Sequence, residues 1–198
     1  MLTLLIGTKN QGKVDEIRAL LTDIDVELIS LTDINVDLDV EEIGKTYAEN
    51  AALKAKAYAQ ASGMITLADD SGLEVDALDG APGLYSARYS SRPNATDADR
   101  RGYLLENLAE YPRPWGARFI CVVALATPEG EPHFYEGICP GEIIPEERGQ
   151  FGFGYDPIFL VEKSEQTMAE LPMEEKNKIS HRARAVIGAR DSILELFV

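Results

Sequence analysis

The chain contains one stretch in which a short apolar segment runs directly into two adjacent carboxylates. Residues 64–67 have the composition and length of a buried strand, and Asp69 and Asp70 follow closely. The pair Ser71-Gly72 predicts a turn before apolar alternation resumes at Leu73. Because side chains alternate between the two faces of a strand, we expect Asp69 and Asp70 to point in opposite directions at the strand end.

Two interpretations of this stretch stay open when it is taken by itself. A carboxylate that faces a cavity at the end of a strand suits a metal-binding site. An Asp-rich turn, whose side chains hydrogen-bond to its own backbone, explains the same residues without any ligand. The other segments of the chain decide between the two.

The charge of the chain restricts the ligands that it can bind. With 198 residues, 45% of them hydrophobic, the chain can form a globular core. Its formal net charge of −15 disfavours binding to a nucleic-acid backbone over the general surface. An anionic ligand would therefore need a local group of Lys and Arg side chains, a helix N-terminus or a divalent cation.

Several features predict a cytoplasmic protein with no membrane partner. No apolar run approaches the length of a transmembrane helix, and the N-terminal residues lack both a basic segment and a small-residue cleavage site. Cys121 lies in an apolar run, and Cys139 precedes a Pro-Gly turn. We expect both to be buried free thiols rather than a disulfide or a metal pair, and neither to be catalytic.

The N-terminus has the pattern of a strand, a loop and the start of a helix. Residues 2–6 form the predicted strand, and an amphipathic helix follows. Asn10 can cap this helix, while Lys9 and Lys13 add positive charge at a helix end that already favours anions. The loop 7–13 lacks the GxxxxGK[ST] spacing of a P-loop, so a phosphate-binding loop and an ordinary connection both stay open.

Two acidic residues precede the next predicted helix. Thr46 and Glu49 form a capping box that opens an alanine-rich helix, so Glu49 is expected to be structural. Glu41 and Glu42 lie just before this cap, in a loop that can carry a carboxylate toward the two aspartates. The pattern permits this approach without requiring it.

The remaining strand and helix signals predict a mixed sheet. Residues 26–31 are predicted to form a second strand, and Thr96 caps a helix that ends before Pro112. Residues 118–126 and 133–144 are long apolar-rich strands, and the turn formers between them favour an antiparallel hairpin. We therefore expect an α/β fold whose sheet is mixed rather than purely parallel.

Two later segments have the composition of a nucleotide site. In residues 149–157 glycines alternate with aromatics, which lets the backbone approach a flat ligand while a ring offers a stacking face. A glycine-rich turn that packs its aromatics into the core explains the same pattern. Residues 175–184 gather basic side chains at the start of the last helix, which suits phosphate or base-edge recognition as well as a solvated helix start.

Six segments, in this order, resemble those of the Ham1/inosine triphosphatase family of non-canonical purine nucleoside triphosphate pyrophosphatases. The segments are Thr8 to Lys13, Glu41 to Asn50, Ala68 to Leu73, Gly80 to Gly83, Phe153 to Pro157 and Ser180 to Arg182. Their order and spacing are similar to the family pattern over nearly the whole chain. Six segments in register are far more specific than any one of them, so the structural alternatives above lose weight.

The resemblance implies both a fold and a reaction. The implied fold is a single domain over residues 1–198, elongated and α/β, with a central mixed sheet flanked by helices and a nucleotide cleft between two lobes. A homodimer is implied, together with Mg²⁺-dependent hydrolysis of ITP, dITP and XTP to the nucleoside monophosphate and pyrophosphate. Carboxylates without a His/Cys cluster independently favour a hard ion such as Mg²⁺ over zinc, and such an ion reconciles the acidic chain with an anionic substrate.

The resemblance also implies roles for particular residues. Asp70 resembles the general base and a metal ligand, with Glu41 or Glu42 as a further metal carboxylate. The implied substrate contacts are Thr8, Lys9, Asn10, Gln11, Gly12, Lys13, Ser71, Phe153, Gly154, Tyr155, Asp156, Lys176, His181 and Arg182. Two positions depart from the family pattern, because Phe151-Gly152 stands where many members carry Gly-Gly and Tyr47 replaces the usual Phe.

Two other functions stay open from the sequence. A Maf-like nucleotide pyrophosphatase acting on pyrimidine or modified nucleotides would also use a lysine-bearing loop and an acidic metal site. Comparing turnover of ITP with that of dTTP and UTP distinguishes a Maf-like enzyme from the purine nucleoside triphosphate pyrophosphatase that the resemblance implies. A regulator that binds a purine nucleotide without hydrolysing it needs no base and no metal, so the presence of Asp70 with the Glu41-Glu42 pair speaks against it.

Overall fold

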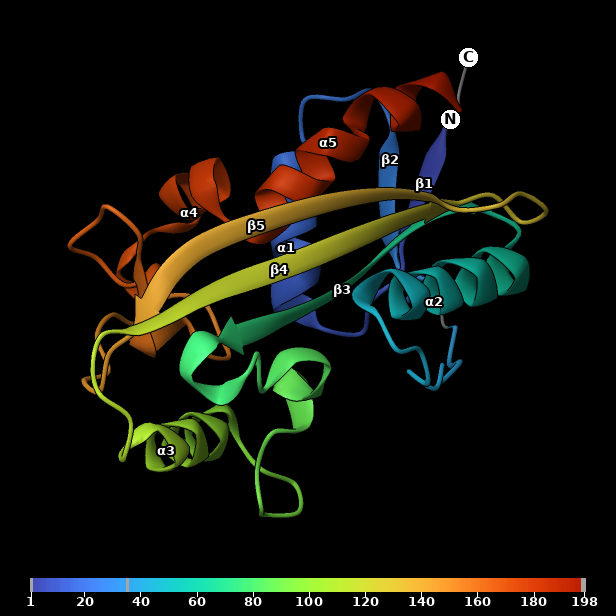
Figure 1. The fold of residues 1–198 in the computed structure, drawn as a ribbon. Coiled ribbons are helices and arrows are strands. Elements are labelled where there is room, and N and C mark those ends of the chain that lie inside the picture. The colour runs from blue at the N-terminus through green and yellow to red at the C-terminus, as the bar shows by residue number, and fades with distance from the viewer. Residues whose placement is uncertain (1, 35, 197–198) are drawn as a thin grey trace. The chain divides into compact units, whose positions relative to one another are not determined.

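The computed structural model describes residues 2–34 and 36–196 (Figure 1). The chain divides into two compact units. The first unit takes the chain up to Asp70, Cys121–Gly137 and the residues from His181 onward, while the second takes Ser71–Ile120 and Ile138–Ser180. The chain therefore leaves the first unit and returns to it twice.

In the described part of the chain, six strands form one sheet in the order β2-β1-β3-β4-β5-β6. Their bounds are Thr3–Ile6 for β1, Glu27–Ser30 for β2, Ile65–Val75 for β3, Trp115–Ala126 for β4, His133–Ile143 for β5 and Phe159–Val161 for β6. β1 pairs in parallel with β2 and with β3, whereas β5 and β6 pair antiparallel. The predicted α/β fold with a mixed sheet is confirmed.

The α-helices of the described residues lie between and after these strands (Figure 1). Their bounds are Gln11–Leu20 for α1, Tyr47–Ser62 for α2, Asp97–Leu108 for α3, Met173–Ile179 for α4 and His181–Glu195 for α5. Short 3₁₀ helices span Asp76–Leu78, Gly83–Arg88, Asp156–Ile158 and Met168–Glu170. α3 opens with a capping box of Thr96 and Asp99, which confirms the cap predicted at Thr96.

The ends of α1 and α2 follow from the local sequence. Asn10 Oδ1 accepts a hydrogen bond from the backbone N–H of Lys13 at 3.2 Å and so caps α1. Thr46 Oγ1 accepts from the N–H of Glu49 at 3.1 Å at the start of α2. α2 ends at Gly63, whose φ of +72° would strain any side chain. The two helices predicted here are therefore confirmed.

The first unit is a sheet covered by helices on both faces. On one face, Leu4, Ile6 and Leu67 share an apolar cluster with side chains of α1 and α5. On the other face, Ala68 packs in a cluster of alanines that includes those of α2. Because side chains alternate along a strand, Leu67 and Ala68 mark the two directions that the following residues of β3 take.

One local prediction is wrong. β3 runs without a break from Ile65 to Val75, so Asp69 and Asp70 lie inside a strand rather than at its end, and Ser71-Gly72 makes no turn. β3 has hydrogen-bonded neighbours on both sides, β1 and β4. The ladder with β1 covers residues 65–67 of β3. Beyond them, β3 stays extended as the hydrogen-bonded neighbour of β4, and this pairing outweighs the turn tendency of a Ser-Gly pair.

The two cysteines of the chain are buried free thiols, as predicted. Burial raises the pKa of the Cys121 thiol far above its usual range, and the nearby Asp69 carboxylate raises it further. The reactive thiolate form is therefore disfavoured at this position. None of the helices described in the structure has both the length and the apolar character that crossing a membrane requires.

The core of the second unit supplies a test of its packing. Phe159 is fully buried, and its ring centroid lies 4.4 Å from that of Phe119. We expect Phe159→Ala to lower the free energy of unfolding by about 3–5 kcal/mol, because it leaves a cavity in a packed core. Phe134, which is 48% exposed, is the matched control, and Phe134→Ala should cost less than about 1 kcal/mol. Urea unfolding measures both, and equal losses would contradict the assigned core.

Candidate functional site

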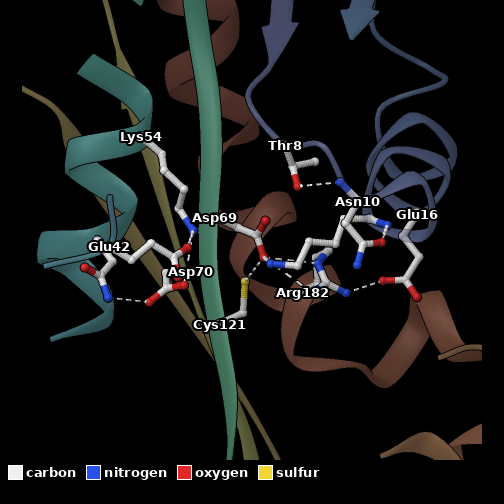
Figure 2. Close-up of polar contacts among 11 residues, drawn as sticks. Thr8, Asn10, Glu16, Glu42, Lys54, Asp69, Asp70, Cys121 and Arg182 are labelled. Atoms are coloured by element: carbon white, nitrogen blue, oxygen red, sulfur yellow. Dashed lines mark hydrogen bonds and ion pairs between the residues drawn. The ribbon is translucent and has the colours of Figure 1, made fainter. Parts of the chain in front are cut away.

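Strand β3 sends its two aspartates to opposite faces of the sheet in the first unit (Figure 2). Asp69 continues the direction of Leu67, toward α1 and α5, and Asp70 continues the direction of Ala68, toward α2. Asp69 is 1% exposed and Asp70 is 7% exposed. The opposite directions predicted for the two carboxylates are confirmed, and each needs its own partners because a buried charge is costly unless it is paired.

Asp70 meets side chains of α2 and of the loop before it. Lys54 Nζ donates to Asp70 Oδ1 at 3.1 Å and to Glu42 Oε1 at 2.6 Å. Asn50 Nδ2 donates to the other oxygen of Asp70 at 3.2 Å. Asn50 and Lys54 are four residues apart on α2 and so share one helix face. The Lys54 ammonium thus bridges two carboxylates.

The electrostatic surroundings make Asp70 a stronger base than an exposed aspartate. Burial raises the pKa of Asp70, and the Glu42 carboxylate raises it further, while the ammonium groups of Lys54 and Lys13 lower it by less. Burial lowers the pKa of Lys54, but Asp70, Asp69 and Glu42 more than compensate and raise it. A carboxylate with a raised pKa beside a fixed cation can accept a proton from water and can bind a cation.

The residues predicted as metal ligands come together only in part. Glu41 is exposed, whereas Glu42 and Asp70 face the same Lys54 ammonium. Across residues 2–34 and 36–196, no three His, Cys, Asp or Glu side chains form a group that could hold a metal ion by themselves. Two hard carboxylate donors fit Mg²⁺, which typically takes one or two protein carboxylates and completes its shell with water and substrate phosphates.

Asp69 is the centre of a second group of charges, on the opposite face of β3. Asp69 Oδ2 accepts from Lys13 Nζ at 2.9 Å and from Nε and Nη2 of Arg182, each at 3.4 Å. Arg182 also donates from Nη1 to the buried carboxylate of Glu16. Burial alone would raise the pKa of Asp69, but the charges of Lys13, Arg182 and Lys54 hold it well below its usual range. Asp69 is therefore an ion-pair partner and not a proton acceptor.

The predicted phosphate loop lies between β1 and the first turn of α1. Thr8 Oγ1 accepts from the backbone N–H of Asn10 at 3.2 Å, and Gln11 Nε2 donates to Asp15 within α1 at 2.7 Å. Lys9 is exposed and lies 3.5 Å from Asp37 Oδ1. Lys13 is the lysine of this loop that turns inward, since its side chain is 16% exposed. Gly12 lies in the first turn of α1.

The predicted base-binding segment is held by several hydrogen bonds within the second unit. Asp156 Oδ2 accepts from the N–H of Phe153 at 3.0 Å and from Lys176 Nζ at 2.6 Å. The Lys176 ammonium lies 5.0 Å from the centroid of the Phe153 ring. The N–H of Gly154 donates to Asp97, at the N-terminus of α3, at 2.8 Å. Tyr155 Oη donates to the carbonyl of Ser86 at 2.9 Å.

The departure from the family pattern at residues 151 and 152 leaves the essential glycine in place. Gly152 has a φ of +73°, and a Cβ there would lie 2.0 Å from Asp156 Oδ2. Any side chain at this position would therefore displace the Asp156 carboxylate. Phe151 is 45% exposed, and its N–H donates to the carbonyl of Ala169 at 2.9 Å.

The basic residues near the C-terminus are distributed among separate partners. Lys176 pairs with Asp156 in the second unit, whereas Arg182 pairs with Asp69 and Glu16 in the first. Lys178 makes an exposed pair within α4. His181 is buried at the start of α5, and Ser71 is half-buried in β3. The predicted group of base-edge cations thus includes two residues that already balance buried carboxylates.

Three residues of these charge groups were not predicted from the sequence. Lys54 and Asn50 were missed although they lie four residues apart in a helix that follows the Glu41-Glu42 pair, which was an available signal. Glu16 was missed because nothing in its local pattern distinguishes a buried acid of α1 from a solvated one. Its partner Arg182 is 166 residues away in the chain.

The fold and the charge groups define a class of protein. It is an α/β protein with a mixed sheet, in which a central strand presents a buried carboxylate beside a lysine that also binds a second carboxylate. The chain belongs to the Ham1 family, whose model matches residues 4–191.

Relatives with known names agree with this assignment. The chain is 46% identical, over 98% of its length and 97% of the relative's, to a dITP/XTP pyrophosphatase of Desulforamulus reducens. It is similar to the solved structure of a HAM1 protein from Coxiella burnetii, with a TM-score of 0.87, 42% identity and coverage of 98% and 100% of the two chains. The Ham1 protein of Staphylococcus aureus gives a TM-score of 0.84, 41% identity and coverage of 99% and 100%.

The Lys176 to Asp156 ion pair yields a prediction about stability. Both side chains are almost completely buried, at 3% and 5% exposure. Lys176→Met should lower the free energy of unfolding by about 3–5 kcal/mol, because it leaves the Asp156 carboxylate buried with its main cation removed. Lys178→Met is the matched control on the same helix and should cause no measurable loss, since the pair of Lys178 with Glu175 is exposed. Chemical denaturation compares the two variants, and a small loss for both would refute the assigned role of Lys176.

Proposed function

We propose that this chain hydrolyses the non-canonical purine nucleoside triphosphates dITP, XTP and ITP to the nucleoside monophosphate and pyrophosphate. The observation that carries the proposal is the buried Asp70, held by Lys54 and Asn50 with Glu42 on the same ammonium. The family membership and the names of the relatives support the substrate class. A protein that only bound a nucleotide would not need a buried carboxylate with a raised pKa.

Asp70 acts as the general base in this proposal. Its carboxylate takes a proton from the water that attacks the phosphate chain, and the raised pKa of Asp70 brings its basicity closer to neutral pH. Asn50 and Lys54 keep the carboxylate oriented while the proton moves. Lys13 and Lys54 stabilise the negative charge that builds on the leaving pyrophosphate. The reaction needs no covalent nucleophile.

Mg²⁺ is the proposed cofactor, with Asp70 and Glu42 as its protein ligands. When bound, the ion would supply positive charge to the triphosphate. We assign Glu42 rather than Glu41 because only Glu42 shares the Lys54 ammonium with Asp70. Lys54, which donates to both carboxylates, would hold them close to each other until the ion and its substrate bind.

The remaining predicted contacts are proposals for the substrate. Lys13, with the loop from Thr8 and with Ser71, is proposed to bind phosphate and sugar, because its ammonium turns inward whereas that of Lys9 is exposed. The segment from Phe153 to Asp156 with Lys176, and His181 with Arg182, are proposed to recognise the base. We also propose a cytoplasmic homodimer that binds neither nucleic acid nor membrane. Residues 1–198 are proposed to act as one domain, because the family match runs through both compact units.

A nucleotide panel with purified protein and Mg²⁺ tests the proposed reaction. We expect pyrophosphate release from XTP, dITP and ITP, and far slower release from ATP, GTP, dTTP and UTP. Asp70→Asn should reduce turnover by about 10²-fold or more while nucleotide binding stays measurable, because the amide keeps the size but loses basicity. Faster turnover of dTTP or UTP would favour the pyrimidine alternative, and binding without turnover would favour the regulator.

The metal assignment has its own test in a matched pair of variants. Glu42→Gln should raise the Mg²⁺ concentration needed for half-maximal rate by about tenfold, and excess metal should restore part of the rate. Glu41→Gln is the matched control. It removes the same charge from the neighbouring side chain, which is exposed, and should leave the metal dependence unchanged. Titration of the rate against Mg²⁺ decides, and a shift for Glu41 alone would reverse the assignment.

A further inference from the structure

Glu16 is a buried acid that none of the six family-like segments contains. It lies in α1 and is 3% exposed. A carboxylate at this depth is costly unless a cation compensates it. Arg182, which is 2% exposed, donates from Nη1 to Glu16 Oε2. Glu16 is thus in direct contact with the Arg182 guanidinium, which donates to Asp69 through its other nitrogens.

Arg182 and Lys13 share a single oxygen of Asp69. Figure 2 shows Asp69 on the side of β3 that faces Arg182. Asp69 Oδ2 accepts from Lys13 Nζ at 2.9 Å, from Arg182 Nε and Nη2 at 3.4 Å, and from Cys121 Sγ at 3.7 Å. Within the described residues, Asp69 Oδ1 is buried and has no hydrogen-bond partner. The two cations therefore compete for one acceptor atom.

The charge of Glu16 affects how strongly Arg182 attracts Asp69 Oδ2. The group holds two cations, Lys13 and Arg182, and two anions, Asp69 and Glu16, so its charges balance. With Glu16 charged, Arg182 has a second carboxylate, and its contacts to Asp69 stay long. With Glu16 neutral, Arg182 would lose one of its carboxylate partners and attract Asp69 more strongly, which would draw Oδ2 toward the guanidinium and away from Lys13.

Lys13 is the member of this group that a ligand can reach. Its side chain is 16% exposed, and its ammonium pairs with Asp69. An ammonium has three N–H donors, so a single bond to Asp69 orients the other two. Fixing a long lysine stem before a ligand arrives removes an entropic cost from binding.

We propose that Glu16 is a positioning residue, which compensates Arg182 so that Asp69 can hold the Lys13 ammonium in the orientation that binds phosphate. The part that concerns phosphate rests on the proposed function. The ordering of Lys13 by Glu16 stands on the contacts alone and can be measured without a substrate.

The first experiment measures Lys13 in the free protein. Competitive labelling of lysines with an amine-reactive reagent, read by mass spectrometry, compares the wild type with Glu16→Gln, and the exposed Lys178 is the internal reference. We expect Lys13 to be labelled several-fold faster in Glu16→Gln, because its ammonium has lost its hold on Asp69. Asp15→Asn, the neighbouring exposed acid on α1, should leave the labelling unchanged.

A double variant separates this role from a general loss of structure. Glu16→Met with Arg182→Met removes the buried pair together, a change that folded proteins often tolerate. Asp69 then has Lys13 as its one cationic partner among these residues, so labelling of Lys13 should return to the slow wild-type rate. Fast labelling in the double variant, or unchanged labelling in Glu16→Gln, would overturn the proposal.

Steady-state kinetics then connect the position of Lys13 to the reaction. Glu16→Gln should lower kcat/KM for XTP and dITP alike by about tenfold, because a phosphate contact carries no information about the base. In a Lys13→Met background the same substitution should have almost no further effect. An undiminished effect in that background would overturn the action through Lys13. If no variant and no wild-type protein turns over a triphosphate while the labelling changes as expected, the proposed function fails and the positioning role of Glu16 stands.

Discussion

The burial of two adjacent carboxylates on a central strand is the constraint on which the rest of the first unit depends. Asp69 and Asp70 are covered on opposite faces of β3, and neither can keep its charge there without cations. The helices that cover the sheet supply them, Lys54 from α2 for Asp70, and Lys13 from α1 with Arg182 from α5 for Asp69. The helices that cover the two faces of the sheet therefore also supply the cations that the two buried aspartates need.

The same alternation gives the two acids different chemistry. Asp70 keeps a raised pKa because burial and Glu42 act against its cations. Asp69 has its pKa lowered because the cations around it outweigh its burial. One peptide bond thus separates a group suited to accept a proton from a group that stays ionised and orders its neighbours.

The second unit also contains a buried carboxylate, Asp156, which a backbone N–H and one lysine compensate. Glycines at positive φ let the segment around Phe153 fold back on Asp156, and that carboxylate accepts a backbone N–H and the Lys176 ammonium. Gly154 and Tyr155 are held by residues near α3 and by Ser86. A backbone held by hydrogen bonds in this way suits recognition of a flat ligand, because less order has to be gained on binding.

The sequence by itself determined the helix caps at Asn10, Thr46 and Thr96, the mixed sheet, and the opposite directions of Asp69 and Asp70. These follow from local rules, since capping and strand alternation involve residues a few positions apart. Tertiary structure decided the rest. The pairing of β3 within the sheet kept Ser71-Gly72 extended, and contacts between residues 166 positions apart joined Glu16 to Arg182. Whether an acid on a helix faces solvent or a buried guanidinium depends on what packs against that helix, which no local pattern contains.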